Sequence, residues 1–230
     1  MTYSNIHKGI FHSRPNRFVA QVEIDGQVHN CHVKNTGRCE LLIPGTEVYL
    51  ERSNKPARVT MYDLVTAYKG EQLVNIDSQA PNHALREYIQ AGNYINNVTY
   101  IKPEARYKGS RFDLYIEADN RKIFIEVKGV TLEKDGVALF PDAPTLRGIK
   151  HLHELTQSIS EGHEAHVVFI VQMKGVKSFA PNWEIHREFG LALAEAHAAG
   201  VKISAFDCIV APNRLVVDKP ILVQLEQPGQ

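Results

Sequence analysis

Residues 111–129, "RFDLYIEADNRKIFIEVKG", predict a β-hairpin. Apolar and polar side chains alternate on both sides of Asp119 and Asn120, and a polar pair of this kind is typical of a tight turn between two strands. With the turn at this position, Leu114 faces Ile125 across the hairpin. One face is then wholly apolar, and its members are Phe112, Leu114, Ile116, Ile123, Ile125 and Val127.

The opposite face of this hairpin carries its charges. Asp113 lies directly across from Glu126, and Lys128 follows on the same face two residues later. Two carboxylates at that separation repel each other, whereas a divalent cation between them makes the arrangement favourable. Mg²⁺ or Mn²⁺ suits such a site, because these ions take carboxylate oxygens and leave positions for water and phosphate oxygens. We therefore interpret Asp113, Glu126 and Lys128 as candidate catalytic residues, with the acids holding the metal and the ammonium serving the attacking water.

Two alternatives compete with this metal site. A turn of three residues would send Asp113 and Glu126 to opposite faces of the hairpin. An exposed hairpin whose charges only exchange surface ion pairs would need no metal at all. Because the acids are opposed and the apolar face is unbroken, the metal site is supported as well as the surface ion pairs are. Both interpretations stay open at this point.

The composition limits the kinds of partner. The chain has 230 residues, enough for two modest domains, and its 26 Lys and Arg balance its 26 Asp and Glu. No global field draws it to a polyanion, so any affinity for DNA must come from local patches. No apolar run is long enough to span a bilayer, and the scattered Cys31, Cys39 and Cys208 fit reduced thiols. We expect a cytoplasmic protein with no membrane partner.

The N-terminal part, residues 1–80, predicts a small β-barrel. Short β-like runs such as "RFVAQVEI" and "QVHNCHV" alternate with turn signals, and no long helix interrupts them. Barrels of the oligonucleotide-binding (OB) type hold nucleic acid strands on one face, and Arg14, Arg17 and Arg38 would help to seat one. A purely structural barrel fits this pattern equally well.

Residues 81–230 predict an α/β domain. A helix follows Asn82 as its N-cap and stops at Gly92, and a longer helix has its apolar positions at Leu146, Ile149, Leu152, Leu155 and Ile159. Between the hairpin and the longer helix, "EKDGVALFPDAPT" predicts a loop, and the continuous apolar run "HVVFIVQM" predicts a buried strand. A further helix and the strand "VKISAFDCIV" follow, and the tail from Pro212 is expected to be peripheral.

Basic side chains gather near the hairpin in the sequence. Arg106, Lys108 and Arg111 lie just ahead of the first acid, and Arg147 and His151 share one face of the longer helix. Contact with DNA phosphates is one interpretation of these residues, and a solvated surface is the other.

Several stretches together resemble a known family. The hairpin resembles the core motif of the PD-(D/E)XK nucleases, and the stretches "NTG", "APN", "SRFD", "EVKGVTL" and "FPDAPTLRGIKHLHEL" resemble the sugar fermentation stimulation protein A family. The resemblance implies an N-terminal OB-fold, a restriction-endonuclease-like C-terminal domain and DNA binding. It also implies that Glu87, a helical acid ahead of the hairpin, completes the metal shell.

The sequence thus predicts a DNA-binding protein with a nuclease-like metal site. Two activities stay open: Mg²⁺-dependent hydrolysis of phosphodiesters, and regulation of sugar (maltose) metabolism genes without cleavage. A small-molecule binding protein tied to sugar use is a third possibility. A homodimer is an open possibility for the assembly.

Overall fold

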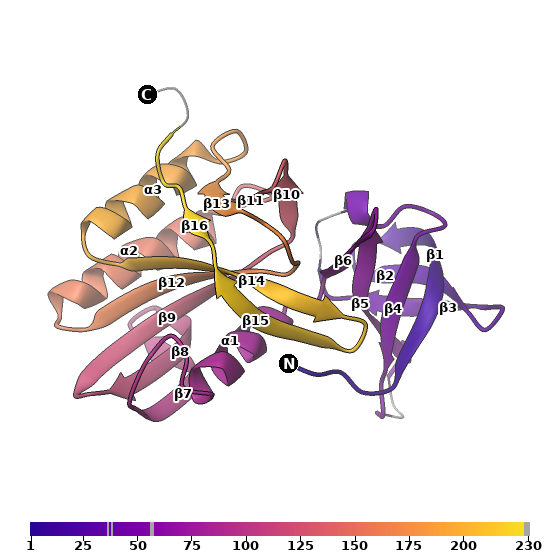
Figure 1. Ribbon diagram of the computed structural model, residues 1–230, viewed down its shortest axis with the longest axis horizontal. Helices are drawn as coiled ribbons and strands as arrows, with labels where there is room; N and C mark the ends of the chain where they lie inside the picture. Colours follow the sequence, from indigo (N-terminus) through magenta and orange to yellow (C-terminus); the bar gives the residue numbers. More distant parts are fainter. Residues whose placement is uncertain (36, 38, 56–57, 228–230) are drawn as a thin grey trace.

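The structure is a computed structural model that describes residues 1–35, 37, 39–55 and 58–227. A β-barrel and an α/β domain lie side by side, with the N-terminal strands forming one body and the later elements the other (Figure 1). No helix in the described ranges is long and apolar enough to cross a membrane.

The N-terminal body is a closed barrel, as predicted. Its strands follow the order β3-β2-β1-β4-β5-β6, and an additional parallel pairing of β3 with β5 closes it. In β2 every second side chain points into the core, namely Ala20, Val22 and Ile24. This alternation explains why a stretch that also contains polar residues forms a barrel strand. A 3₁₀-helix, η1 (Cys39–Leu41), precedes β4. The strands are β1 (Ile6–Asn16), β2 (Val19–Ile24), β3 (Gln27–Val33), β4 (Glu47–Arg52), β5 (Tyr62–Lys69) and β6 (Gln72–Asn75).

The second body is a mixed six-stranded sheet with helices on both faces, which confirms the α/β class. Its order is β15-β14-β12-β9-β8-β7, and the central strands β9, β12 and β14 run parallel. β12 is buried along nearly its whole length, as expected for a parallel strand covered on both faces. The strands are β7 (Val98–Tyr107), β8 (Ser110–Ala118), β9 (Arg121–Val130), β12 (Glu164–Val171), β14 (Lys202–Ala211) and β15 (Arg214–Pro220).

Helix α1 (Ala80–Gln90) covers one face of this sheet, and α2 (Leu146–Ser160) and α3 (Arg187–Ala198) cover the other. The N-cap prediction for α1 is wrong: the cap is Gln79, with Pro81 in the first turn, so Asn82 lies inside the helix. Helix α2 is capped by Thr145, whose side chain accepts from the Gly148 N–H at 3.0 Å.

Two peripheral predictions also need correction. The expected loop after the hairpin forms β10 (Leu132–Lys134) and β11 (Val137–Phe140), which join β13 (Ser178–Pro181) and β16 (Leu222–Val223) in a small second sheet. The tail from Pro212 is not peripheral, because β15 pairs with β14 and buries Leu215 and Val217 in the core cluster that α1 shares.

Candidate functional site

The hairpin of β8 and β9 has the predicted register over its paired part. Leu114 pairs with Ile125, and the ladder continues to the turn at Asp119 and Asn120. The ladder ends at Leu114, however, so the predicted direct pair of Asp113 with Glu126 is not formed.

The end of the hairpin is distorted by a local irregularity in β8. The Phe112 ring packs 5.3 Å from the Phe124 ring on the α2 side of the sheet, whereas Leu114 belongs to the core cluster beneath α1. Phe112 is therefore not on the apolar face where the alternation placed it. Opposite this point Glu104 of β7 has a left-handed backbone (φ 55°), and the β7–β8 ladder skips this residue without a change of register. Asp113 is thus paired in neither of the two ladders that β8 forms.

Asp113 is held by two donors at this irregular point. Its Oδ2 accepts from the backbone N–H of Val127 at 2.7 Å, in place of a ladder carbonyl, and its Oδ1 accepts from Asn82 Nδ2 at 2.7 Å. Burial and the charge of Glu126 raise the pKa of Asp113 to about 6, against the lowering effects of Val127, Lys128 and Asn82. A cation would relieve this cost of holding two neighbouring acids ionised.

Glu126 lies deeper, with only 4% of its surface exposed. Its Oε1 accepts from Lys128 Nζ at 2.6 Å and from His151 Nδ1 of α2. Burial opposes ionisation, but these hydrogen bonds and the charge of Lys128 outweigh it and lower the pKa of Glu126, so the carboxylate is ionised. Its second oxygen, Oε2, is buried and has no hydrogen-bond partner in the described part of the chain.

The donor set fits a hard divalent cation. A buried, unpartnered carboxylate oxygen is costly unless something binds it, and Asp113 keeps further lone pairs beyond its two hydrogen bonds. Mg²⁺ is commonly held by one or two carboxylates together with water and phosphate oxygens. The described residues contain no cluster of three metal-binding side chains, so protein ligands alone would leave much of the coordination shell open.

Lys128 and His151 fix the Glu126 carboxylate from two sides. Lys128 is 14% exposed in its side chain and reaches back along its own strand, as predicted from its spacing. His151, predicted to contact DNA, is instead 4% exposed, so its main contact is with Glu126. Its Nε2 accepts weakly from Arg147 Nε at 3.4 Å, which assigns the ring proton to Nδ1. His151 therefore orients the acid.

The predicted basic residues near the hairpin line a single groove of about 520 Å³. Arg106 and Arg147 form no ion pair with the residues described, whereas Lys108 pairs with Glu161 and Arg111 Nε lies 2.6 Å from Glu104 Oε2. The groove adjoins the candidate metal centre through His151, which lines it and contacts Glu126. Its lining residues are Arg106, Lys108, Gly109, Ser110, Arg111, Arg147, Lys150 and His151.

Other predicted site residues lie apart from this centre. Glu87 is on α1, but its carboxylate pairs with the amino group of Met1, so the structure does not bring it to the hairpin acids. The Arg14 guanidinium donates to the backbone carbonyls of Asn35 and Gly37 and so braces a barrel loop. Arg17 is exposed on the barrel, 4.7 Å from the centre of the Phe18 ring. Arg38 lies outside the described residues.

Two residues of the candidate site escaped sequence reasoning. The sequence predicts Asn82 as a helix cap, yet Asn82 lies inside α1 and its side chain donates to Asp113. Lys150 lies one turn from Arg147 on α2 and lines the same groove; its helical spacing was a signal that could have identified it.

Comparison with known proteins is consistent with this architecture. Residues 13–76 match the model of the SfsA N-terminal OB domain, and residues 79–214 match that of the sugar fermentation stimulation protein RE domain. The chain is 52% identical over 226 residues to a sugar fermentation stimulation protein homolog of Ruminiclostridium cellulolyticum, covering 98% of this chain and 100% of the relative. It is 54% identical to one of Desulfitobacterium hafniense, covering 98% and 99%. The solved structure of Pyrococcus furiosus SfsA in complex with Ca²⁺ superimposes with a TM-score of 0.89 at 30% identity, covering 97% of this chain and 98% of that one.

Proposed function

This chain belongs to the sugar fermentation stimulation protein family, and from that premise we propose that it binds DNA and hydrolyses phosphodiesters with a divalent metal held by Asp113 and Glu126. The observation that carries the proposal is Glu126 Oε2, a buried oxygen of an ionised carboxylate that no described residue satisfies. A relative in the same family that was solved with Ca²⁺ supports an oxygen-binding divalent ion as the ligand.

Each residue of the centre has a separate task in this proposal. Asp113 and Glu126 would supply the protein oxygens to the ion, and the ion would polarise the phosphoryl group and its attacking water. Asn82 and the Val127 N–H orient Asp113, and His151 orients Glu126. The Lys128 ammonium, next to Glu126, would hold the attacking water and offset the charge that develops on the phosphate oxygens.

The basic groove supports DNA as the substrate. Arg106, Arg147 and Lys150 bring positive charge to the groove that leads to His151, in a chain whose overall charge is balanced. Affinity that arises from such a local patch depends steeply on salt.

A cleavage assay tests the enzymatic half of the proposal. Plasmid and single-stranded DNA are incubated with the protein in Mg²⁺ or Mn²⁺, beside Lys128→Met and Glu126→Gln. The matched control is Lys122→Met, an exposed lysine of the same strand. We expect each site variant to lower the cleavage rate by at least about 100-fold while the control cleaves normally. Equal rates in all four proteins would assign the cleavage to a contaminant and refute the proposal.

A second candidate function is a regulator of sugar metabolism genes that binds DNA without cutting it. It is favoured by the small number of acids at the centre, since no third metal-binding side chain joins Asp113 and Glu126 within the described ranges. The same assay separates the two functions: salt-sensitive DNA binding with no cleavage in either metal would favour the regulator.

A further inference from the structure

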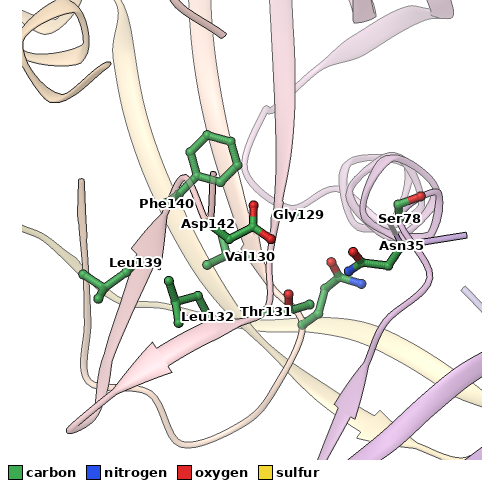
Figure 2. Close-up of a pocket in the computed structure, with 10 residues that line it drawn as sticks. Asn35, Ser78, Gly129, Val130, Thr131, Leu132, Leu139, Phe140 and Asp142 are labelled. Carbon is green, nitrogen blue, oxygen red and sulfur yellow. The ribbon is translucent and has the colours of Figure 1, made fainter. Parts of the chain in front are cut away.

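A small cavity of about 130 Å³ lies between the barrel and the α/β domain, close to the hairpin acids but distinct from the basic groove. Figure 2 shows its side chains approaching from both bodies: Asn35 comes from the barrel, and Asp142 from the loop after β11. The lining residues are Asn35, Ser78, Gly129, Val130, Thr131, Leu132, Leu139, Phe140, Asp142 and Gln172.

The cavity has the size and the chemistry for one heterocyclic ring. A protein cavity of roughly 150 Å³ accommodates benzene, and this one is only slightly smaller. The cavity has an apolar part, formed by Val130, Leu132, Leu139 and Phe140. Its polar side chains are those of Asn35, Ser78, Thr131, Asp142 and Gln172. Such a combination of apolar wall and few convergent polar groups is typical of a small-ligand site.

Two of the polar groups are free to bind a ligand. Asp142 forms no hydrogen bond or ion pair with the part of the chain that the structure describes, so its carboxylate can accept from N–H groups. Asn35 uses its side-chain oxygen to accept from the Gly37 N–H at 3.0 Å, which leaves its Nδ2 as a donor. An acceptor and a donor beside an apolar wall match the Watson–Crick edge and the faces of a nucleobase.

Asp142 is exposed, and its carboxylate lies where the barrel loop approaches the α/β domain. A Cβ at Gly37 would lie 2.7 Å from Asp142 Oδ2, so a glycine is what lets the barrel loop approach the carboxylate this closely. The pocket therefore depends on both bodies being in place.

The cavity is also next to the metal centre. Gly129 follows Lys128 in β9, and three residues of a strand from Glu126 to Gly129 span roughly 10 Å. Ser78 lines this cavity and also a second one of about 360 Å³, whose lining includes Asp113. Since stacked nucleotides are about 3.4 Å apart along a strand, a strand with one phosphate at the acids passes this cavity within a few nucleotides.

We propose that the cavity binds one nucleobase, turned out of its stack, from the strand whose phosphate lies at Asp113 and Glu126. This inference rests on the proposed function and narrows its substrate class. Removing a base from a duplex costs stacking and pairing energy, and the cost is least where the base is already unpaired. The preferred substrates are therefore single strands and duplexes with an unpaired or mismatched base near the cleaved bond.

The test combines a base-walking series with a charge-matched pair of variants. Single-stranded oligonucleotides carry either 2-aminopurine, whose fluorescence rises when it leaves the stack, or an abasic residue, at each position in turn. Binding is measured for the wild type, Asp142→Asn and the control Asp135→Asn, an exposed aspartate in the β10–β11 turn. Both variants remove one negative charge, so a general charge effect cancels between them.

We expect one position at which 2-aminopurine brightens on binding and at which an abasic residue weakens binding by the wild type. Asp142→Asn should weaken binding of the intact strand roughly tenfold, with no further loss on the strand that is abasic at that position. The inference is overturned if DNA binds but no position brightens, or if Asp142→Asn acts equally on intact and abasic strands. Absence of any DNA binding by the wild type would instead refute the proposed function, and the inference with it.

Discussion

His151 Nδ1 of helix α2 is hydrogen-bonded to Glu126 Oε1 of strand β9, so the longest helix of the α/β domain is joined to the candidate metal centre. The imidazole fixes one carboxylate oxygen and leaves the other, Oε2, for a ligand. His151→Gln should therefore lower the affinity for Mn²⁺ by about 10–100-fold, as loss of a residue that orients a metal ligand commonly does. Titration calorimetry measures this, with the exposed His153→Gln of the same helix as the control. An unchanged affinity would show that Glu126 needs no orientation from α2.

The unpaired arginines of the groove should set the salt dependence of DNA binding. Each phosphate contact to duplex DNA adds about 0.9 to the slope of log affinity against log salt. Arg106→Gln together with Arg147→Gln should therefore reduce the slope by about 1 to 2. Fluorescence anisotropy over a series of salt concentrations gives the slope, with Lys122→Gln as the control; a slope that does not change would place the DNA elsewhere.

Gly129 should tolerate no side chain, because of the close approach of helix α1. An added Cβ would lie 2.8 Å from Pro81 Cγ and 2.5 Å from Gln172 Oε1, and the proline ring cannot move without the helix. Gly129→Ala should lower the free energy of unfolding by about 1–3 kcal/mol and disturb the Asn82 contact to Asp113. Gly109→Ala is the control, since an added Cβ there would lie 4.0 Å from the nearest atom in the described part of the chain, Glu154 Oε1. Urea denaturation compares the two, and equal stabilities would contradict the packing described here.

Acid sensitivity should arise in part from Glu164. Burial opposes its ionisation, but hydrogen bonds from Lys202, His166 and Arg121 outweigh burial and lower the pKa of Glu164 from 4.5 to about 2. A group whose pKa is lowered by folding stabilises the fold above its unfolded pKa, and this contribution is lost as the pH falls through the folded value. The wild type should thus lose up to about 3 kcal/mol from this group between pH 5 and pH 2.

Glu164→Gln should remove that part of the pH dependence and be less stable than the wild type at pH 7. Denaturant titrations at several pH values measure both effects, with the exposed Glu71→Gln as the control. If the curves of Glu164→Gln and the wild type stay parallel from pH 5 to pH 2, the ion-pair network does not hold the carboxylate as described.

The hairpin shows what could be predicted from the sequence. The alternation and the turn pair gave the correct partner for Leu114, because both are local properties of the chain. The position of Phe112 on the α2 side could not be predicted in the same way, since the irregularity next to it involves Glu104 of β7 and the Asn82 contact to Asp113, which lie outside the hairpin. The direct pairing of Asp113 with Glu126 was predicted wrongly, because the β8–β9 ladder ends at Leu114.

For the helices and the edge strands, too, local patterns could be predicted from the sequence, whereas contacts between distant segments could not. The apolar positions at helical spacing correctly placed Leu152 and Leu155 of α2 in the core. Leu146, the first residue of this helix, is instead 79% exposed, because the core does not reach the start of the helix. Strand β15 was missed since its pairing with β14 and its contact with α1 link distant segments. The role of His151 was missed for the same reason: its partner Glu126 lies 25 residues earlier in the chain.

The central claim is that Asp113 and Glu126 share one divalent ion, and a crystal soaked in Mn²⁺ tests it most directly. The account predicts an anomalous density peak about 2 Å from a carboxylate oxygen of each residue, with Glu126 Oε2 as one of the ligands. A fully soaked crystal with both carboxylates intact and no peak between them, or with the ion bound elsewhere, would contradict it.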